Sequence, residues 1–250
     1  MSSIPRDSAV VAWRNILRIR RTPQLIVFAT IQPVMFVLLF TFVFGGSIPT
    51  PGFEYVDYLV PGILVQTAAF GSSSTAIGLA DDLKRGMVDR FRSLPMARAA
   101  FLGGRTIADL ARAVVVVTMV LLVGFLVGFR PHGGALYIAA GVVLVLGLGF
   151  SMSWMFACLA LVVKDPEAAA TAGFIPLFPF VFASSIFTRP EAMPEWLQGF
   201  AENQPLTRVC DAVRGLMLAS STADVLPAVL WIIAILGVFA PTAVVLYRRT

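Results

Sequence analysis

Carboxylates, imidazoles and thiols are the side chains that catalyse reactions or hold metals, and this chain offers few of them in suitable groups. Near its apolar segments, Asp81, Asp82 and Asp89 are the only candidates for a catalytic cluster, and they lie among Lys and Arg as in a solvated helix. The two cysteines and the single histidine, His132, show no metal-ligand spacing. The sequence therefore predicts no catalytic centre and no metal site.

A site for a nucleoside triphosphate is also missing from the sequence. Such a site needs a loop of the form Gly-x-x-x-x-Gly-Lys-Ser/Thr, whose backbone amides and lysine hold the phosphates. The segment Gly103-Gly-Arg105 lacks the lysine and the helix-capping Ser/Thr arrangement. We predict that this chain holds no cofactor, and that any ATP and magnesium that drive its work are bound by another polypeptide.

The composition is that of a protein surrounded by lipid. Of the 250 residues, 58% are hydrophobic and 13% are charged, whereas soluble domains carry about a quarter charged residues. Apolar runs long enough to cross a hydrocarbon core of about 30 Å predict an all-α integral membrane protein. The six predicted spans are Leu25–Phe44, Tyr58–Ala80, Leu110–Phe129, Ala135–Val163, Ala168–Phe187 and Val225–Tyr247. We expect one membrane domain over residues 1–250, with the six-span bundle in residues 25–247.

The distribution of basic residues predicts the orientation of these spans. Of the 19 Lys and Arg residues, 15 fall on the side that would hold both termini and four on the other side. Basic residues gather on the cytoplasmic side of membrane proteins, so both termini are expected in the cytoplasm. The net charge of +5 is explained by this asymmetry and by anionic lipid, and we predict no nucleic-acid binding.

Two cytoplasmic segments have the composition of contact surfaces. Residues 1–24 are predicted to contain an amphipathic helix at the membrane surface, with Trp13 at headgroup depth and Arg14 on the polar face. Residues 81–109 connect the second and third spans with far more chain than a reverse turn needs, and mix apolar residues with arginines. The alternatives are a simple topology anchor for the first segment and packing on its own bundle for the second.

At this connection the sequence resembles a known family. The runs Asp89-Arg-Phe-Arg-Ser-Leu-Pro95 and Gly104-Arg-Thr-Ile-Ala-Asp109 are similar to the signature of ABC-2 type permeases, in particular the daunorubicin/doxorubicin-resistance permeases of actinobacteria. Further pieces of the pattern follow in order, namely Tyr58-Leu-Val-Pro-Gly62, Asn203-Gln-Pro-Leu-Thr207 and Asp211-Ala-Val-Arg214. Together they cover most of the chain.

The resemblance implies a role in export and a set of partners. Members of the family are membrane subunits of ATP-driven exporters, in which two membrane subunits pair with two copies of a separate ATPase. An identical second permease copy is preferred over a different one, and membrane lipid surrounds the pair. The external residues 188–217 would form short helices that re-enter the outer leaflet. The residues assigned by the resemblance to ATPase coupling are Asp82, Lys84, Arg85, Asp89, Arg90, Phe91, Arg92, Leu94, Pro95, Trp13 and Arg14.

The spans also suggest a path for cargo. Within the predicted spans there is no Asp, Glu, Lys or His, and only Arg112 lies near an end, which favours a hydrophobic or amphipathic cargo over ion coupling. Polar and aromatic residues that could line this path are Gln66, Ser72, Ser73, Phe174, Phe178, Phe182 and Ser185. The alternative is that these phenylalanines face lipid and these serines make helix contacts.

The sequence thus predicts the permease subunit of an exporter for drug, lipid or glycolipid in the bacterial cell membrane. It leaves an ion-coupled carrier, a membrane scaffold and a lipid-modifying membrane enzyme as alternatives.

Overall fold

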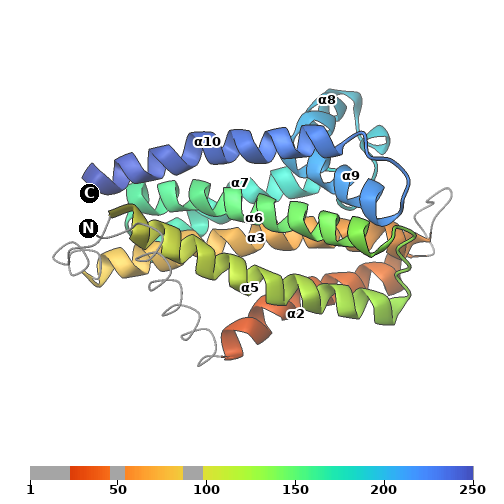
Figure 1. The fold of residues 1–250 in the computed structure, drawn as a ribbon, viewed down its shortest axis with the longest axis horizontal. Helices are drawn as coiled ribbons and strands as arrows, with labels where there is room; N and C mark the ends of the chain where they lie inside the picture. The colour runs from red at the N-terminus through yellow and green to blue at the C-terminus, as the bar shows by residue number, and fades with distance from the viewer. Residues whose placement is uncertain (1–22, 46–53, 87–97, 250) are drawn as a thin grey trace.

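The chain folds into a bundle of long helices that run roughly along one axis (Figure 1). The computed structural model describes residues 23–45, 54–86 and 98–249. Within these residues the elements are helical, and no strand is formed. The long helices are α2 (Pro23–Leu39), continued by the π-helix η1 (Phe40–Phe44), then α3 (Tyr55–Lys84), α5 (Arg98–Val127), α6 (Ala135–Val163), α7 (Pro166–Phe182) and α10 (Val225–Arg249).

Three short helices lie between α7 and α10. They are the 3₁₀ turn η2 (Pro190–Ala192), α8 (Glu195–Asn203) and α9 (Pro205–Met217). Figure 1 places α8 and α9 together at one end of the bundle, which we call the α9 end. The C-terminus of α10 lies at the opposite end, near the connection between α6 and α7. We call this opposite end the charged end, after Asp82, Lys84, Arg105 and Asp165.

Five of these helices are long and apolar enough to cross a membrane, against the six that the sequence predicted. The predicted fifth span, Ala168–Phe187, is instead the 17-residue helix Pro166–Phe182, which a turn follows. The fourth predicted span, Ala135–Val163, matches α6 at both ends. An all-helical integral membrane fold is therefore confirmed, while the sixth crossing is not.

The helix that contains the third predicted span begins about three turns before that span. The sequence placed the start of the span at Leu110 because charged residues precede that position, whereas α5 begins at Arg98 and its apolar part at Leu102. The charges do not end the helix, because Arg105 and Asp109 both find partners on α3. Likewise α3 extends beyond the predicted Tyr58–Ala80 at both ends.

A tight turn joins α6 to α7 at the charged end. Lys164 ends α6 in the left-handed conformation, with a φ of 60°. The next residue, Asp165, caps α7, since its carboxylate accepts hydrogen bonds from the amides of Glu167 and Ala168, both at 3.1 Å. Pro166 occupies the first helical position, where its missing N–H costs nothing. These residues return the chain directly into the bundle.

Helix α3 is the centre of the bundle and contacts α2, α5, α6, α7 and α9. Every residue from Tyr55 to Gln66 is buried. By contrast, α2 and α10 expose large apolar side chains, including Phe28 at 71% and Leu226 at 67% of their surface. An apolar exterior around a buried central helix is what a lipid solvent favours.

Candidate functional site

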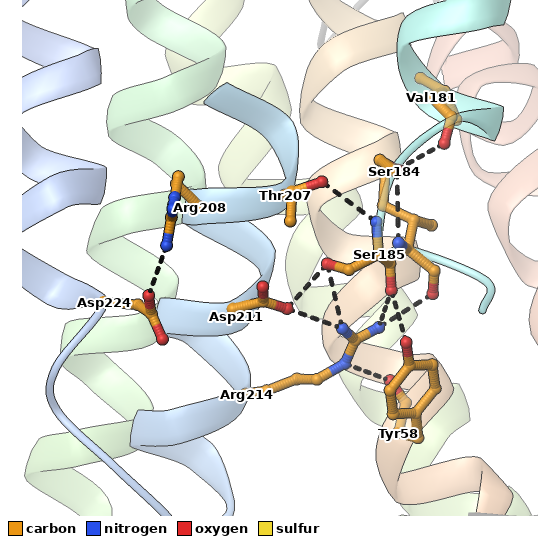
Figure 2. Close-up of polar contacts among 10 residues, drawn as sticks. Tyr58, Val181, Ser184, Ser185, Thr207, Arg208, Asp211, Arg214 and Asp224 are labelled. Carbon is orange, nitrogen blue, oxygen red and sulfur yellow. Dashed lines mark hydrogen bonds and ion pairs between the residues drawn. The ribbon is translucent and has the colours of Figure 1, made fainter. Parts of the chain in front are cut away.

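At the α9 end a buried arginine joins three parts of the chain (Figure 2). Arg214, on α9, is only 7% exposed. Its Nε donates a hydrogen bond to the Tyr58 carbonyl at 2.9 Å, and its Nη2 donates to the carbonyls of Ser185 at 2.7 Å and Ile186 at 2.9 Å. The guanidinium also lies 3.6 Å from the centre of the Tyr58 ring, as a cation–π pair. A single side chain thereby fixes α9 to α3 and to the turn after α7.

The charge of this arginine is balanced within the same group of residues. Asp211 lies 3.1 Å from Nη1 of Arg214 and accepts a hydrogen bond from the Ser185 hydroxyl at 2.7 Å. Tyr58 Oη donates to the Ser185 carbonyl at 2.8 Å, and the Ser185 amide donates to Thr207 Oγ1 at 3.1 Å. Burial raises the pKa of the Asp211 carboxyl, and the charge of Arg214 opposes that rise. We call these five residues the Arg214 cluster.

A glycine makes this close packing of helices feasible. A methyl group at Gly62 would overlap the backbone carbonyl of Ile186, so the turn after α7 can reach α3 only where no side chain intervenes. The motif pieces around Tyr58–Gly62, Thr207 and Asp211–Arg214, which are separate in the sequence, therefore meet in one place. Ser185, which the sequence assigned to the cargo path, lies in this cluster.

Halfway along the bundle, a cavity of about 220 Å³ lies between α2, α3, α5 and α6, and we call it the polar cavity after the few polar residues in its mostly apolar wall. Asp109 and Arg112 of α5 line it and form an ion pair at 3.5 Å. Asp109 accepts a hydrogen bond from Thr75 at 2.7 Å. Arg112 donates to the Gly71 carbonyl at 3.0 Å and to the hydroxyl of Ser74. The two charges thus balance each other on α5, and their further hydrogen bonds go to α3. Helix α5 is apolar enough to span a membrane.

Two of the predicted path residues, Gln66 and Ser72, line this cavity. The hydroxyl of Ser72 donates to the Ala69 carbonyl at 2.6 Å, and that of neighbouring Ser73 donates to the Phe70 carbonyl at 2.7 Å. Asp109 and Arg112 were not predicted as site residues. Asp109 closes the motif that begins at Gly104. Arg112 follows three positions later, a spacing that puts both residues on one helix face.

Beside the cavity, phenylalanines from three helices form a continuous row. On α7, Phe174, Phe178 and Phe182 recur every fourth residue, with ring centres 5.1 and 5.0 Å apart. Phe70 of α3 lies 5.3 Å from Phe174, and Phe187 lies 5.3 Å from Phe182. The phenylalanine row is completed by α2 and consists of Phe36, Phe40, Phe70, Phe174, Phe178, Phe182 and Phe187.

The row is both exposed and continuous with the cavity. The three predicted path residues on α7, at positions 174, 178 and 182, are each 43–44% exposed. Phe36 and Phe70 also line the polar cavity. The structure therefore places Gln66 and Ser72 in the cavity wall with Asp109 and Arg112, and it connects Phe174, Phe178 and Phe182 to that wall through Phe70.

The charged end holds the described part of the predicted coupling set. Asp82 is buried and pairs with Arg105 of α5. Lys84 pairs at 2.9 Å with Asp165, and its hydrogen bond lowers the pKa of that carboxyl. Arg85 pairs with Asp81, one turn away, at 2.9 Å. The Asp82–Arg105 pair links the end of α3 to α5, and the Lys84–Asp165 pair links it to the start of α7.

The remaining predicted coupling residues lie outside the described residues, and so does the predicted N-terminal helix. They are Asp89, Arg90, Phe91, Arg92, Leu94, Pro95, Trp13 and Arg14.

The pattern of the ABC-2 type transporter family matches residues 8–218 of this chain. The chain belongs to that family. The matched range includes the cavity, the phenylalanine row, the charged end and all five residues of the Arg214 cluster.

Named relatives of this ABC-2 chain are permeases. It is 34% identical to the daunorubicin resistance ABC transporter permease protein DrrB1 of Streptomyces coeruleorubidus, over 95% of this chain and 84% of that protein. It is 27% identical to the doxorubicin resistance ABC transporter permease protein DrrB of Mycobacterium tuberculosis, over 79% and 66% of the two chains. It is 22% identical to the probable multidrug ABC transporter permease YbhR of Escherichia coli, over 80% and 54%.

We expect Arg214→Ala to destabilise the protein severely, because Asp211 loses its charge partner and three carbonyls each lose a buried donor. Breaking a buried pair by removing one partner costs about 3–5 kcal/mol. The matched control is Arg208→Ala on the same helix, whose pair with Asp224 at 3.3 Å is about one-third exposed and should contribute less than about 1 kcal/mol. Thermal unfolding in detergent measures both. Equal losses for the two variants would contradict the assigned role of the Arg214 cluster.

Proposed function

We propose that this chain is the membrane-spanning permease subunit of an ATP-driven ABC exporter that moves hydrophobic or amphipathic cargo, such as a drug, lipid or glycolipid. The family match over residues 8–218 carries the proposal. Two of its relatives are named for resistance to daunorubicin and to doxorubicin. The exposed phenylalanine row beside a polar cavity suits molecules with both aromatic and polar parts.

The topology that fits this role has six crossings, with α7 as the fifth. Its 17 residues extend about 25 Å, near the lower limit for a transmembrane helix, and a turn of chain continues it. Six crossings put both termini on one side, and the excess of Lys and Arg makes that the cytoplasm. The charged end then faces the cytoplasm of a bacterial cell, and the α9 end faces outward.

On the outer side, α8 and α9 are proposed to re-enter the outer leaflet. Trp196 and Phe200 lie one turn apart on α8 and are 80% and 44% exposed. Aromatic side chains exposed in this way are favoured where a membrane meets water. The Arg214 cluster would hold this pair of helices against α3.

The proposed partner is a separate cytoplasmic ATPase, present in two copies, which binds ATP and magnesium. ABC-2 permeases work with such a subunit, and the sequence of this chain has no phosphate-binding loop. We assign the contact to residues 81–98, with the N-terminal helix beside it. A second copy of this chain would complete the membrane part, as a homodimer surrounded by lipid.

The charged end offers a route for force from that contact to the cargo path. Asp82 and Arg105 tie the ends of α3 and α5 together, and the bond from Thr75 to Asp109 repeats the connection further along the same helices. Lys84, at the end of α3, pairs with Asp165 at the start of α7, and α7 carries part of the phenylalanine row. A displacement at residues 81–98 would therefore move three cargo-facing helices together.

Transport by a purified complex tests the proposal. The permease alone should hydrolyse no ATP, and the permease with its cognate ATPase should accumulate doxorubicin in inverted proteoliposomes in an ATP-dependent, vanadate-sensitive manner. A catalytically inactive ATPase serves as the control. ATP hydrolysis by the permease alone would contradict the proposal.

Because Asp109 and Arg112 lie in an apolar helix, the same vesicles are also tested with a proton gradient and without the ATPase. Cargo uptake under those conditions would favour an ion-coupled carrier.

We expect Arg105→Ala to lower ATP-driven transport more than it lowers ATP hydrolysis, because Asp82 loses its partner and α3 separates from α5. Arg208→Ala, whose partly exposed pair with Asp224 lies at the α9 end and outside this route, should change transport by less than about twofold. The ratio of cargo moved to ATP hydrolysed is measured for both variants. An unchanged ratio in Arg105→Ala would remove this pair from the proposed route.

A further inference from the structure

The side-chain oxygen of Gln66, Oε1, is a buried acceptor with no hydrogen-bond partner in the described part of the chain. The residue is 3% exposed and its Oε1 is fully enclosed. It also lines the polar cavity. Leaving such a group unsatisfied costs about 1–3 kcal/mol, and native structures rarely keep that cost without a reason. A buried acceptor without a partner, on a residue that lines a cavity, points to a hydrogen-bond donor bound in that cavity.

A second acceptor lies in the same cavity. The Asp109 carboxylate accepts a hydrogen bond from Thr75, and its other oxygen is 3.5 Å from Arg112, beyond good hydrogen-bond distance. An ionised carboxylate has about four acceptor sites, so capacity remains. Since Arg112 cancels the charge of Asp109, the cavity attracts donors without requiring a fully charged ligand.

The cavity has the size and position of a subsite rather than of a complete binding site. Its volume of about 220 Å³ equals roughly seven water molecules at about 30 Å³ each, which is enough for a polar head group. Two of its wall residues, Phe36 and Phe70, belong to the phenylalanine row. A molecule with its polar group in the cavity would lay its apolar part along the row.

We propose that the cavity between α2, α3, α5 and α6 is a head-group subsite, in which Gln66 and Asp109 accept hydrogen bonds from an amine or hydroxyl of an amphipathic cargo. That the bound molecule is a transported cargo rests on the proposed function. Binding at the subsite itself does not depend on the ATPase. The phenylalanine row binds the apolar part by contact alone, which tolerates many shapes. The subsite would therefore select cargo by its donor group.

Three probes with the same chain test the subsite: dodecylamine, dodecanol and dodecyl methyl ether, the last of which has no donor. Their affinities are measured by native mass spectrometry for the permease in lipid nanodiscs. The key variant is Gln66→Met, which keeps length and shape but removes both polar atoms. Gln198→Met on α8, whose amide donates to the Met193 carbonyl outside the cavity, is the matched control.

The affinities of the amine and the alcohol for the unmodified protein should be at least about tenfold higher than their affinities for Gln66→Met. A tenfold loss corresponds to the loss of about one hydrogen bond. The ether should bind both equally, and Gln198→Met should behave like the unmodified protein. The ratio of amine to alcohol affinity then distinguishes the two donor types. Equal affinities of the three probes for the unmodified protein would overturn the subsite, and this ranking decides the matter even where Gln66→Met fails to fold.

The outcome is separable from that of the proposed function. Where the probes follow the expected order but the complex transports nothing with ATP, the exporter proposal fails and the subsite stands. Where ATP drives transport but Gln66→Met changes no probe's affinity, the subsite fails and the exporter proposal stands.

Discussion

Three arginines from neighbouring helices lie against three glycines of α3, and the polar organisation of the bundle depends on these contacts. Arg214 packs at Gly62, Arg112 donates to the carbonyl of Gly71, and the guanidinium of Arg105 occupies the space beside Gly78. In lipid, a charged group must be satisfied inside the protein. Each arginine has an aspartate beside it, at positions 211, 109 and 82 respectively.

This arrangement divides α3 into three functional lengths. The Arg214 cluster holds the α9 end, the Asp109–Arg112 pair faces the cavity in the middle, and the Asp82–Arg105 pair joins α3 to α5 at the charged end. One rigid helix therefore connects the proposed ATPase contact with the proposed cargo path and the outer helices. Movement of α3 relative to α7 would change the phenylalanine row, because Phe70 contacts Phe174 and Phe178 across that boundary.

Apolar run length was sufficient to predict most of the helices, and α6 was predicted at both ends. The start of α5 was missed because charges were treated as a membrane boundary, although Arg105 pairs with Asp82 of α3 and Asp109 accepts a hydrogen bond from Thr75 of α3. The motif around Tyr58 and that around Arg214 could be recognised in sequence, but not their proximity, since 156 residues separate the two bonded groups. Hydropathy carries no information on such long-range pairs, and for the same reason Asp109 and Arg112 were not assigned to the cargo path.

The central claim, that α3 needs glycine where the chain packs on it most closely, is tested most directly by comparing Gly62→Ala with Gly71→Ala in nanodiscs by thermal unfolding. A methyl group at Gly62 would overlap the Ile186 carbonyl, whereas nothing lies within 4 Å of the same group at Gly71. Alanine is favoured over glycine in a helix by about 0.5–1 kcal/mol. The account predicts that Gly71→Ala is as stable as the unmodified protein or more so, and that Gly62→Ala unfolds at a clearly lower temperature. Equal or raised stability in Gly62→Ala would contradict it.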